Sequence, residues 1–206
     1  MDKSLRIGID IDGVLRDFIE GVINRVKVSH PQYTDQITRP NEWSISCFLP
    51  FWEEKRCKNY VFQEEVDKVF SEAPIYQDVL DNWKSLRTWA RKRKHKLVIV
   101  SAQRDRTLHP SLIWLGKHKL EFKELHFTSN KWKVDVDFLI DDKPKNLELF
   151  AKQSVSGGMP ICFSQPWNTD LHDKYTTITS ISEIKEIVDK LTKRGLYSEH
   201  NTPKNA

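Results

Sequence analysis

Strand-like segments alternate with helical patterns along most of this 206-residue chain. The strand-like segments lie at residues 5–9, 97–100, 124–127, 136–140, 161–163 and 176–178. Apolar residues recur with helical spacing at 14–29, 77–94, 110–119, 144–155 and 183–193. Strands that alternate with helices pair in parallel, because each connection has to cross a face of the sheet. We therefore predict an α/β fold, a Rossmann-like parallel sheet with helices on both faces.

The segment from residue 31 to residue 74 interrupts this alternation. It is rich in aromatic residues and has no strong strand pattern, and helical spacing favours helices over 50–60 and 63–72. We predict a small, mainly helical cap inserted after the first strand and helix. The expected division is an α/β core at 1–17 and 75–195, a cap at 18–74 and a flexible tail at 196–206.

Composition limits the cellular setting. No apolar run reaches the roughly 18 residues that a membrane helix needs, and we see no secretory signal, so we expect a cytoplasmic protein without membrane contact. Cys47, Cys57 and Cys162 are odd in number and widely spaced, which favours free thiols. The net charge of +4 is mild. The basic run at 91–96 could contact nucleic acid, but it lacks aromatic residues and we interpret it as a helix end.

Polar side chains follow several of the predicted strands. Asp10 and Asp12 come after the first, Ser101 after 97–100, Lys131 after 124–127, and the pair 141–142 after 136–140. A tight turn would explain one of the first two aspartates, but not both. The carboxyl ends of parallel strands meet at one edge of a sheet, so these groups are expected to converge.

Converging carboxylates require a cation, because like charges at short range destabilise one another. An all-oxygen cluster with room for substrate oxygens suits Mg²⁺. Adding a lysine and a hydroxyl gives the groups needed for phosphoryl transfer through an aspartyl phosphate. One carboxylate would attack phosphorus, and a second would protonate the leaving oxygen and then activate water.

The ordered set of motifs resembles the haloacid dehalogenase superfamily of phosphatases. The motifs are Asp10-Ile-Asp-Gly-Val, Val98-Ile-Val-Ser, Lys131, and Leu139-Ile-Asp-Asp. The extended first motif, from Asp10 to Phe18, is similar to that of the 5′(3′)-deoxyribonucleotidase family. That family carries a helical cap between its first and second motifs, where this chain has its insertion.

The resemblance implies roles for residues of this chain. Asp10 would be the nucleophile and a Mg²⁺ ligand, and Asp12 the general acid and base, its backbone carbonyl also ligating the metal. The phosphoryl group would be held by Ser101, Ala102 and Lys131. Asp142 would be the second carboxylate ligand of the metal. Asp141 would be a further ligand or would support Asp142, and which of the two ligates the metal directly stays open.

Departures from the family pattern concern the mouth of the site. Ser101 stands where threonine is expected, and Arg16 where a small residue is expected. Arg16 and Arg104 could contact a substrate phosphate, with a solvated arginine as the alternative. Asp17 is expected on a helix surface or beside the cap. The segment Gln165–Asn168 resembles one found in bacterial and viral relatives, with a simple turn as the alternative.

Substrate selectivity has to come from the cap, because Mg²⁺, aspartate and lysine recognise only phosphate. Trp43, Phe48, Phe51 and Trp52 could stack on a base, or could form the cap's own core. We expect a Mg²⁺-dependent phosphatase acting on nucleoside monophosphates, in particular deoxyribonucleotides. A phosphatase for another small ester or a nucleic acid 3′-phosphate is one alternative, and a non-catalytic phosphate-binding module is another. A nucleic acid partner is not expected, and a homodimer is left open.

Overall fold

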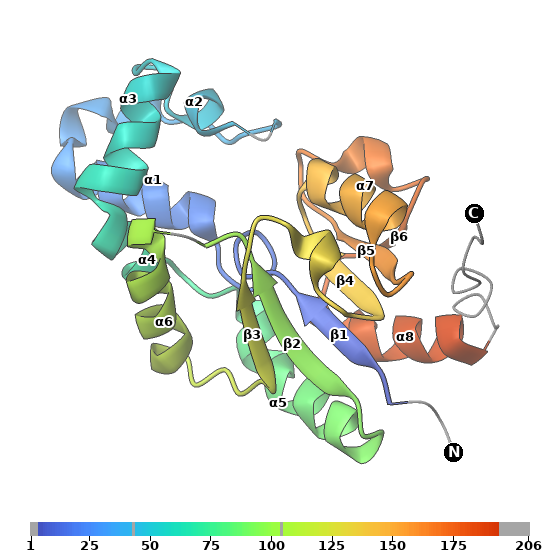
Figure 1. Ribbon diagram of the computed structural model, residues 1–206. Coiled ribbons are helices and arrows are strands. Elements are labelled where there is room, and N and C mark those ends of the chain that lie inside the picture. The colour runs from blue at the N-terminus through green and yellow to red at the C-terminus, as the bar shows by residue number, and fades with distance from the viewer. Residues whose placement is uncertain (1–3, 43, 104, 194–206) are drawn as a thin grey trace.

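The computed structural model describes residues 4–42, 44–103 and 105–193 (Figure 1). Within them lies a six-stranded sheet with the order β3-β2-β1-β4-β5-β6. All five pairings are parallel. The strands are β1 (Arg6–Ile9), β2 (Lys96–Ser101), β3 (Glu124–Phe127), β4 (Phe138–Asp141), β5 (Met159–Phe163) and β6 (Thr176–Ile178). The predicted parallel α/β fold is confirmed.

Helices occupy the segments between the strands. The α-helices are α1 (Phe18–Ser29), α2 (Ile45–Phe48), α3 (Glu54–Asn59), α4 (Val66–Glu72), α5 (Gln77–Lys92), α6 (Leu108–Lys117), α7 (Pro144–Gln153) and α8 (Ile184–Lys193). A π-helical turn spans Tyr60–Glu64, and short 3₁₀ turns include Asp105–Thr107 and Lys131–Lys133. None of the described helices has both the length and the apolar content that crossing a bilayer requires.

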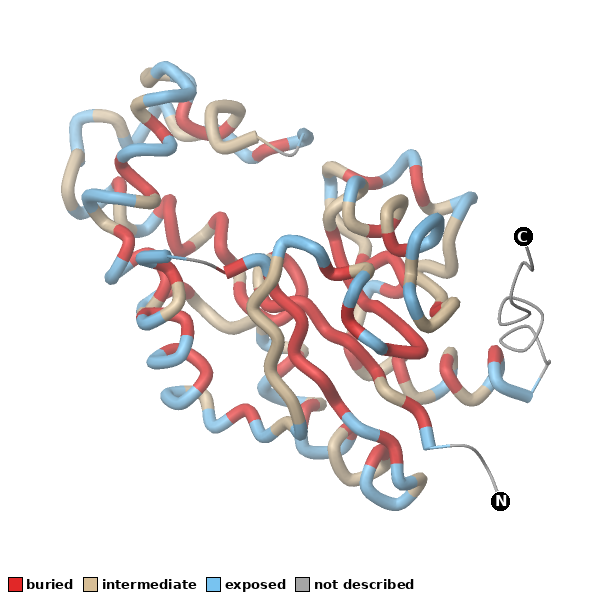
Figure 2. Tube along the Cα trace, in the orientation of Figure 1, coloured by how far each residue is buried: buried red, intermediate tan, exposed pale blue. Residues whose placement is uncertain are grey.

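The two faces of the sheet pack against different helices. Residues such as Ile9 and Ile99 point to one side, where they pack against α5, α6 and α8. Their neighbours Val98 and Leu139 point to the other side, where they pack with Phe150 of α7. Because side chains of a strand alternate between its faces, a strand covered on both sides must be apolar throughout. The central strands β1, β2 and β4 are accordingly buried over most of their length, whereas the edge strand β3 is only half-buried (Figure 2).

Helices α1 to α4 form a separate group beyond the carboxyl ends of β1 and β2 (Figure 1). The buried face of α1, including Val22 and Val26, packs with Phe48, Tyr60 and Phe70 in a hydrophobic cluster of its own. Helix α1 therefore belongs to the cap. On this packing we propose the division of the chain into a core and a cap of residues 18–74. The tail at 196–206 lies outside the described residues.

Several boundaries differ from those predicted. The first helix begins at Phe18 and not at residue 14, because Leu15 and Arg16 both donate their N–H groups to the carbonyl of Ile11 in a tight turn. Asp17 then caps the helix by accepting from the N–H of Glu20 at 3.0 Å. The helices predicted over 50–60 and 63–72 are shorter and separated by the π-helical turn, which a 3.6-residue period does not reveal.

Two smaller predictions are confirmed. Helix α5 ends at Lys92, inside the basic run, so the run is a helix end as interpreted. Cys47, Cys57 and Cys162 are free thiols.

Candidate active site

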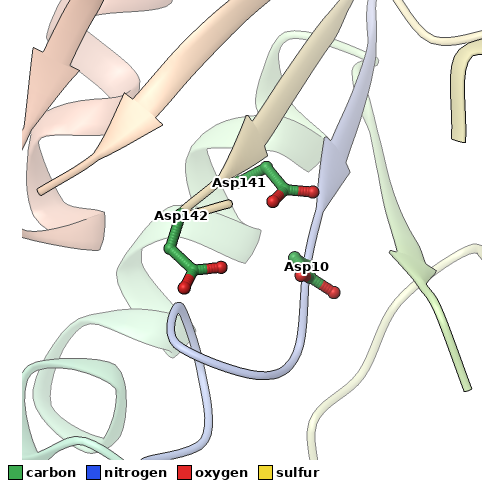
Figure 3. Close-up of side chains that lie close together, drawn as sticks. All are labelled: Asp10, Asp141 and Asp142. Carbon is green, nitrogen blue, oxygen red and sulfur yellow. The ribbon is translucent and has the colours of Figure 1, made fainter. Parts of the chain in front are cut away.

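The predicted strand ends meet at one edge of the sheet. Asp10 directly follows β1, Ser101 ends β2 and Asp141 ends β4, while Lys131 lies in the 3₁₀ turn after β3. Parallel pairing of β1 with both β2 and β4 brings the first three together. Figure 3 shows Asp10, Asp141 and Asp142 around one spot, and their carboxylate oxygens lie within 4.8 Å of one another.

Lys131 joins the carboxylates of two strands. Its Nζ lies 2.7 Å from Asp10 Oδ2 and 2.6 Å from Asp141 Oδ2, and its side chain is almost fully buried. Burial would lower the pKa of Lys131, but the charges of Asp10 and Asp141 outweigh it and raise the pKa. Lys131 is therefore a permanent cation at the centre of the cluster.

One lysine does not neutralise the cluster. Burial raises the pKa of Asp10 to about 6. The charge of Lys131 opposes this rise, and the charges of Asp141 and Asp12 add to it. Burial together with the charges of Asp141 and Asp10 raises the pKa of Asp142 well above its ordinary value. The site therefore favours a second positive charge, which would hold both carboxylates ionised.

Asp141 and Asp142 differ in the partners of their oxygens. Asp141 accepts hydrogen bonds from Lys131 at 2.6 Å, from the backbone N–H of Lys143 at 2.9 Å and from the amide of Asn146 at 3.1 Å. Among the described residues Asp142 Oδ1 has no partner although it is buried. A buried carboxylate oxygen without a donor is costly, so this oxygen is suited to a cation.

Gly13 makes room for Asp142. Its φ of +77° is in the left-handed region, and a Cβ at this position would lie 2.3 Å from Asp142 Oδ2. The turn after β1 therefore lies so close to the Asp142 carboxylate that only glycine fits at position 13.

Asp12 is held at both oxygens. Arg16 Nε donates to Oδ1 at 2.7 Å, and the amide of Gln103 donates to Oδ2. The Arg16 side chain is 0% exposed. The expectation that Arg16 is solvated or contacts a substrate phosphate is therefore wrong, because its guanidinium faces inward to Asp12.

A cavity of about 500 Å³ opens above the carboxylates. Its lining includes the predicted residues Asp10, Asp12, Ser101, Ala102 and Asp142. These five residues therefore share one cavity, and Lys131, which does not line it, contacts Asp10 of the lining.

A family model described as 5′ nucleotidase, deoxy (Pyrimidine), cytosolic type C protein matches residues 3–194 of the chain. The chain belongs to this family. A search of curated protein sequences finds no significant match.

Solved structures agree on the fold of this nucleotidase family member. A structure described as a predicted phosphatase from Clostridium acetobutylicum has a TM-score of 0.63 at 16% identity, over 92% of this chain and 100% of that one. A haloacid dehalogenase-like family hydrolase from Streptococcus pneumoniae has 0.60 at 13%, over 91% and 98%. L-2-haloacid dehalogenase from Xanthobacter autotrophicus, with chloropropionic acid covalently bound, has 0.58 at 9%, over 91% and 99%. At such identities the matches show the fold alone.

Membership of this nucleotidase family makes the chain a phosphoric monoester hydrolase, and its fold is that of a haloacid dehalogenase-like hydrolase. The resemblance drawn from the ordered motifs is confirmed.

In this nucleotidase family member, the aromatic residues of the cap that line the cavity are not those predicted from the sequence. Phe18, Phe62 and Phe70 line it, and the ring centroids of Phe18 and Phe70 lie 5.3 Å apart. Phe48 lines an adjoining cavity of about 450 Å³, which shares Phe18, Phe62 and Lys143 with the first.

Phe51 and Trp52 are half-buried and pack against the hydrophobic cluster of the cap. Phe51 stacks on Tyr33 with ring centroids 4.4 Å apart, and Trp52 packs against Tyr60 at 4.9 Å. For these two residues the packing therefore favours a contribution to the cap's own core over stacking on a base. Trp43 and Arg104 lie outside the described residues.

The segment after β5 contains contacts that the sequence did not predict. Trp167 Nε1 donates to Asp142 Oδ2 at 3.0 Å, and the amide of Asn168 donates to the backbone carbonyl of Asp142 at 2.7 Å. The amide of Gln165 donates to the carbonyl of Gly13 at 2.8 Å. The segment is therefore more than a turn, because it holds both loops that carry the aspartates.

Gln103 and Asn146 were also missed, since a single amide next to a motif is too common to single out. The only available signal was proximity, one lying two residues after Ser101 and the other four after Asp142.

Proposed function

We propose that this protein is a Mg²⁺-dependent nucleotidase that removes phosphate from nucleoside monophosphates, in particular deoxyribonucleotides, through an aspartyl phosphate on Asp10. The observation that carries the proposal is the buried group of three aspartates around Lys131, opening into a cavity with an aromatic wall. A cytoplasmic location is part of the proposal, in line with the cytosolic type in the family's description.

The residues at the strand ends fit Mg²⁺. The donors are all oxygen, which hard cations prefer, and Asp142 offers a buried oxygen without a partner among the described residues. Enzymes of the superfamily generally use this ion. We assign it to Asp10, Asp142 and the backbone carbonyl of Asp12, with Asp141 as support, because the oxygens of Asp141 are already occupied by Lys131 and Asn146. When bound, the ion supplies positive charge to the phosphoryl oxygens.

In the first half of the reaction, an oxygen of Asp10 attacks phosphorus and the bond from phosphorus to the ester oxygen breaks. Lys131 fixes the Asp10 carboxylate by holding its Oδ2, and Lys131 with the Ser101 hydroxyl stabilises the transferring phosphoryl group. Asp12 begins the cycle protonated and gives this proton to the departing ester oxygen, so that the product leaves as an alcohol.

In the second half, water attacks the phosphorus of the aspartyl phosphate and loses a proton to Asp12. Inorganic phosphate leaves, and both aspartates return to their initial states. Asp12 is placed for this exchange because it lines the same cavity as Asp10.

The cap supports a nucleoside as the leaving group. Phe18, Phe62 and Phe70 provide apolar ring surface on which a base could stack, next to the phosphate position. A non-catalytic binding module would not need Asp10, Asp12 and Lys131 together.

A nucleic acid 3′ end is disfavoured by the location of the basic run. The run leads into β2 at Lys96, whereas the site lies at Ser101, the opposite end of the same strand. Its charges therefore lie away from the phosphate position, at the far end of the strand.

The test is phosphate release with Mg²⁺ from ribo- and deoxyribonucleoside 5′- and 3′-monophosphates, with a sugar phosphate and a 3′-phosphorylated oligonucleotide as controls. We expect a preference for nucleoside monophosphates and complete loss of turnover in Asp10→Asn. Phe62→Ala should raise KM for the nucleotide but not for p-nitrophenyl phosphate. A flat substrate profile would favour a general phosphatase, and an active Asp10→Asn variant would rule out the aspartyl phosphate.

A further inference from the structure

Arg16 is a buried charge at the centre of the contact between the core and the cap. Its side chain is 0% exposed, although this position in the family pattern is expected to hold a small residue. A buried guanidinium needs partners for its N–H groups and an anion for its charge.

The guanidinium is fixed on every side. Nε pairs with Asp12 Oδ1 at 2.7 Å, Nη1 donates to the carbonyl of Phe70 in α4 at 2.7 Å, and both Nη atoms lie 3.3 Å from the hydroxyl of Ser111 in α6. The rings of Phe70 and Trp114 pack on it with centroids 4.9 and 5.3 Å from Cζ. Arg16 therefore has one position, set by the cap on one side and the core on the other.

Asp12 takes its orientation from this fixed group. Arg16 occupies Oδ1. Oδ2 accepts from the amide of Gln103 and lies on the side of Gln103 and Ser101, both of which line the cavity. Rotation of the Asp12 carboxyl would take Oδ1 away from Arg16 Nε and leave a buried N–H donor without a partner, which is unfavourable whether Asp12 is protonated or ionised.

We propose that Arg16 is a positioning residue that anchors Asp12 through Oδ1 and reserves Oδ2 for proton exchange with the substrate. This inference rests on the role proposed for Asp12. The proton passes from Oδ2 to the ester oxygen as that oxygen leaves phosphorus, and the attacking water returns a proton to Oδ2. Arg16 itself touches neither reacting group, and it links the placement of the acid to the position of α4.

The leaving group provides the test. Without the proton from Asp12 a nucleoside would have to leave as an unstable alkoxide, whereas p-nitrophenolate is stable enough to leave without a proton. The ratio kcat/KM covers only the steps up to release of the leaving group, so it isolates this proton transfer from the later attack of water. Arg16→Lys should lower kcat/KM for a deoxyribonucleoside monophosphate by roughly 10- to 100-fold, while p-nitrophenyl phosphate should change by less than about threefold.

Two further variants separate positioning from folding. Ser111→Ala keeps both members of the ion pair and removes one anchor of Arg16, so it should show the same selective loss to a smaller degree. In an Asp12→Asn background, Arg16→Lys should cause no additional loss for the nucleotide, because the group it positions is already gone. Thermal melting of each variant checks the fold. If Arg16→Lys does not fold, Ser111→Ala decides the question by the same comparison of substrates.

Equal losses for both substrates, or an undiminished loss in the Asp12→Asn background, would overturn the proposal. Failure of the proposed function would instead be visible in the wild-type protein, as absence of Mg²⁺-dependent hydrolysis of either ester, and would remove the positioning role with it.

Discussion

Gly13→Ala is the sharpest test of the metal site, because its effect can be worked out from two distances. A Cβ on Gly13 would lie 2.3 Å from Asp142 Oδ2 and 2.5 Å from its Cγ, where ordinary contacts begin at 3.4 Å. The carboxylate would have to retreat by about 1 Å, and a displacement of that size in a catalytic group can cost about 10²-fold in rate.

Asp142 has little freedom to make this movement. Its Oδ2 is held by Trp167 and its backbone carbonyl by Asn168. Alanine would also have to adopt the φ of +77° observed at Gly13, which costs roughly 1–2 kcal/mol for a residue with a side chain. For a chain of this length that corresponds to a fall in Tm of about 2–8 °C.

The assay is initial-rate phosphate release over a range of Mg²⁺ concentrations, with melting curves recorded with and without Mg²⁺. We expect kcat/KM to fall by about 10²-fold and the rise in Tm on adding Mg²⁺ to shrink. Gly116→Ala is the matched control: a Cβ there has no described atom within 4 Å, and helix α6 should gain about 0.5–1 kcal/mol. A Gly13→Ala enzyme with wild-type kcat/KM and Mg²⁺ response would refute the assignment of Asp142.

The remaining predictions concern three other positions. Lys131→Met removes the cation between two buried carboxylates, and kcat at saturating nucleotide should fall by on the order of 10²-fold or more. Trp167→Phe keeps an aromatic ring but removes the indole N–H that donates to Asp142, so the Mg²⁺ concentration for half-maximal activity should rise roughly 10-fold or more. The hydrogen bond from Arg6 lowers the pKa of Glu124 from 4.5 to about 2. Its stabilisation is therefore complete above pH 4.5 and lost toward pH 2, and the difference in Tm between wild type and Glu124→Gln should shrink over that interval.

Controls for these variants lie close by in the chain. Lys133→Met changes an exposed lysine of the same 3₁₀ turn and should leave kcat near wild type; equal losses at the two lysines would contradict the assignment of Lys131. Trp132→Phe alters a tryptophan packed on the α7 face of the sheet and should not change the Mg²⁺ requirement. A difference in Tm at Glu124 that is constant with pH would show that its charge contributes nothing.

The fold and the strand ends could be predicted because both follow from local pattern. A strand covered on two faces has to be an apolar run, as 97–100 is, and parallel pairing then forces the residue after each strand to the same edge. Asp10, Ser101 and Asp142 were located by this argument alone.

The environment of each group could not be predicted, because it depends on contacts between distant segments. Phe62 and Trp52 are equivalent as cap aromatics in the sequence, and both pack against the cap cluster, yet Phe62 lines the cavity whereas Trp52 packs on Tyr60. Asp141 and Asp142 are adjacent in the sequence, and their different partners, such as Lys131 for Asp141 and Trp167 for Asp142, come from distant segments. Arg16 was misjudged for the same reason, since a mouth-facing and a buried arginine have the same local sequence.

Asp12 shows why stability and catalysis cannot be treated separately at this site. Its charge neutralises Arg16, which is completely buried and has Asp12 as its ion-pair partner among the described residues. Removing one member of a buried pair costs about 3–5 kcal/mol because the other charge is left without compensation. An Asp12 variant therefore loses both the acid and part of the contact between α4 and the core. Activity of such a variant can be assigned to proton transfer only when its melting curve shows that it remains folded at the assay temperature, and the comparison of alkyl and aryl esters then separates the chemical loss from the structural one.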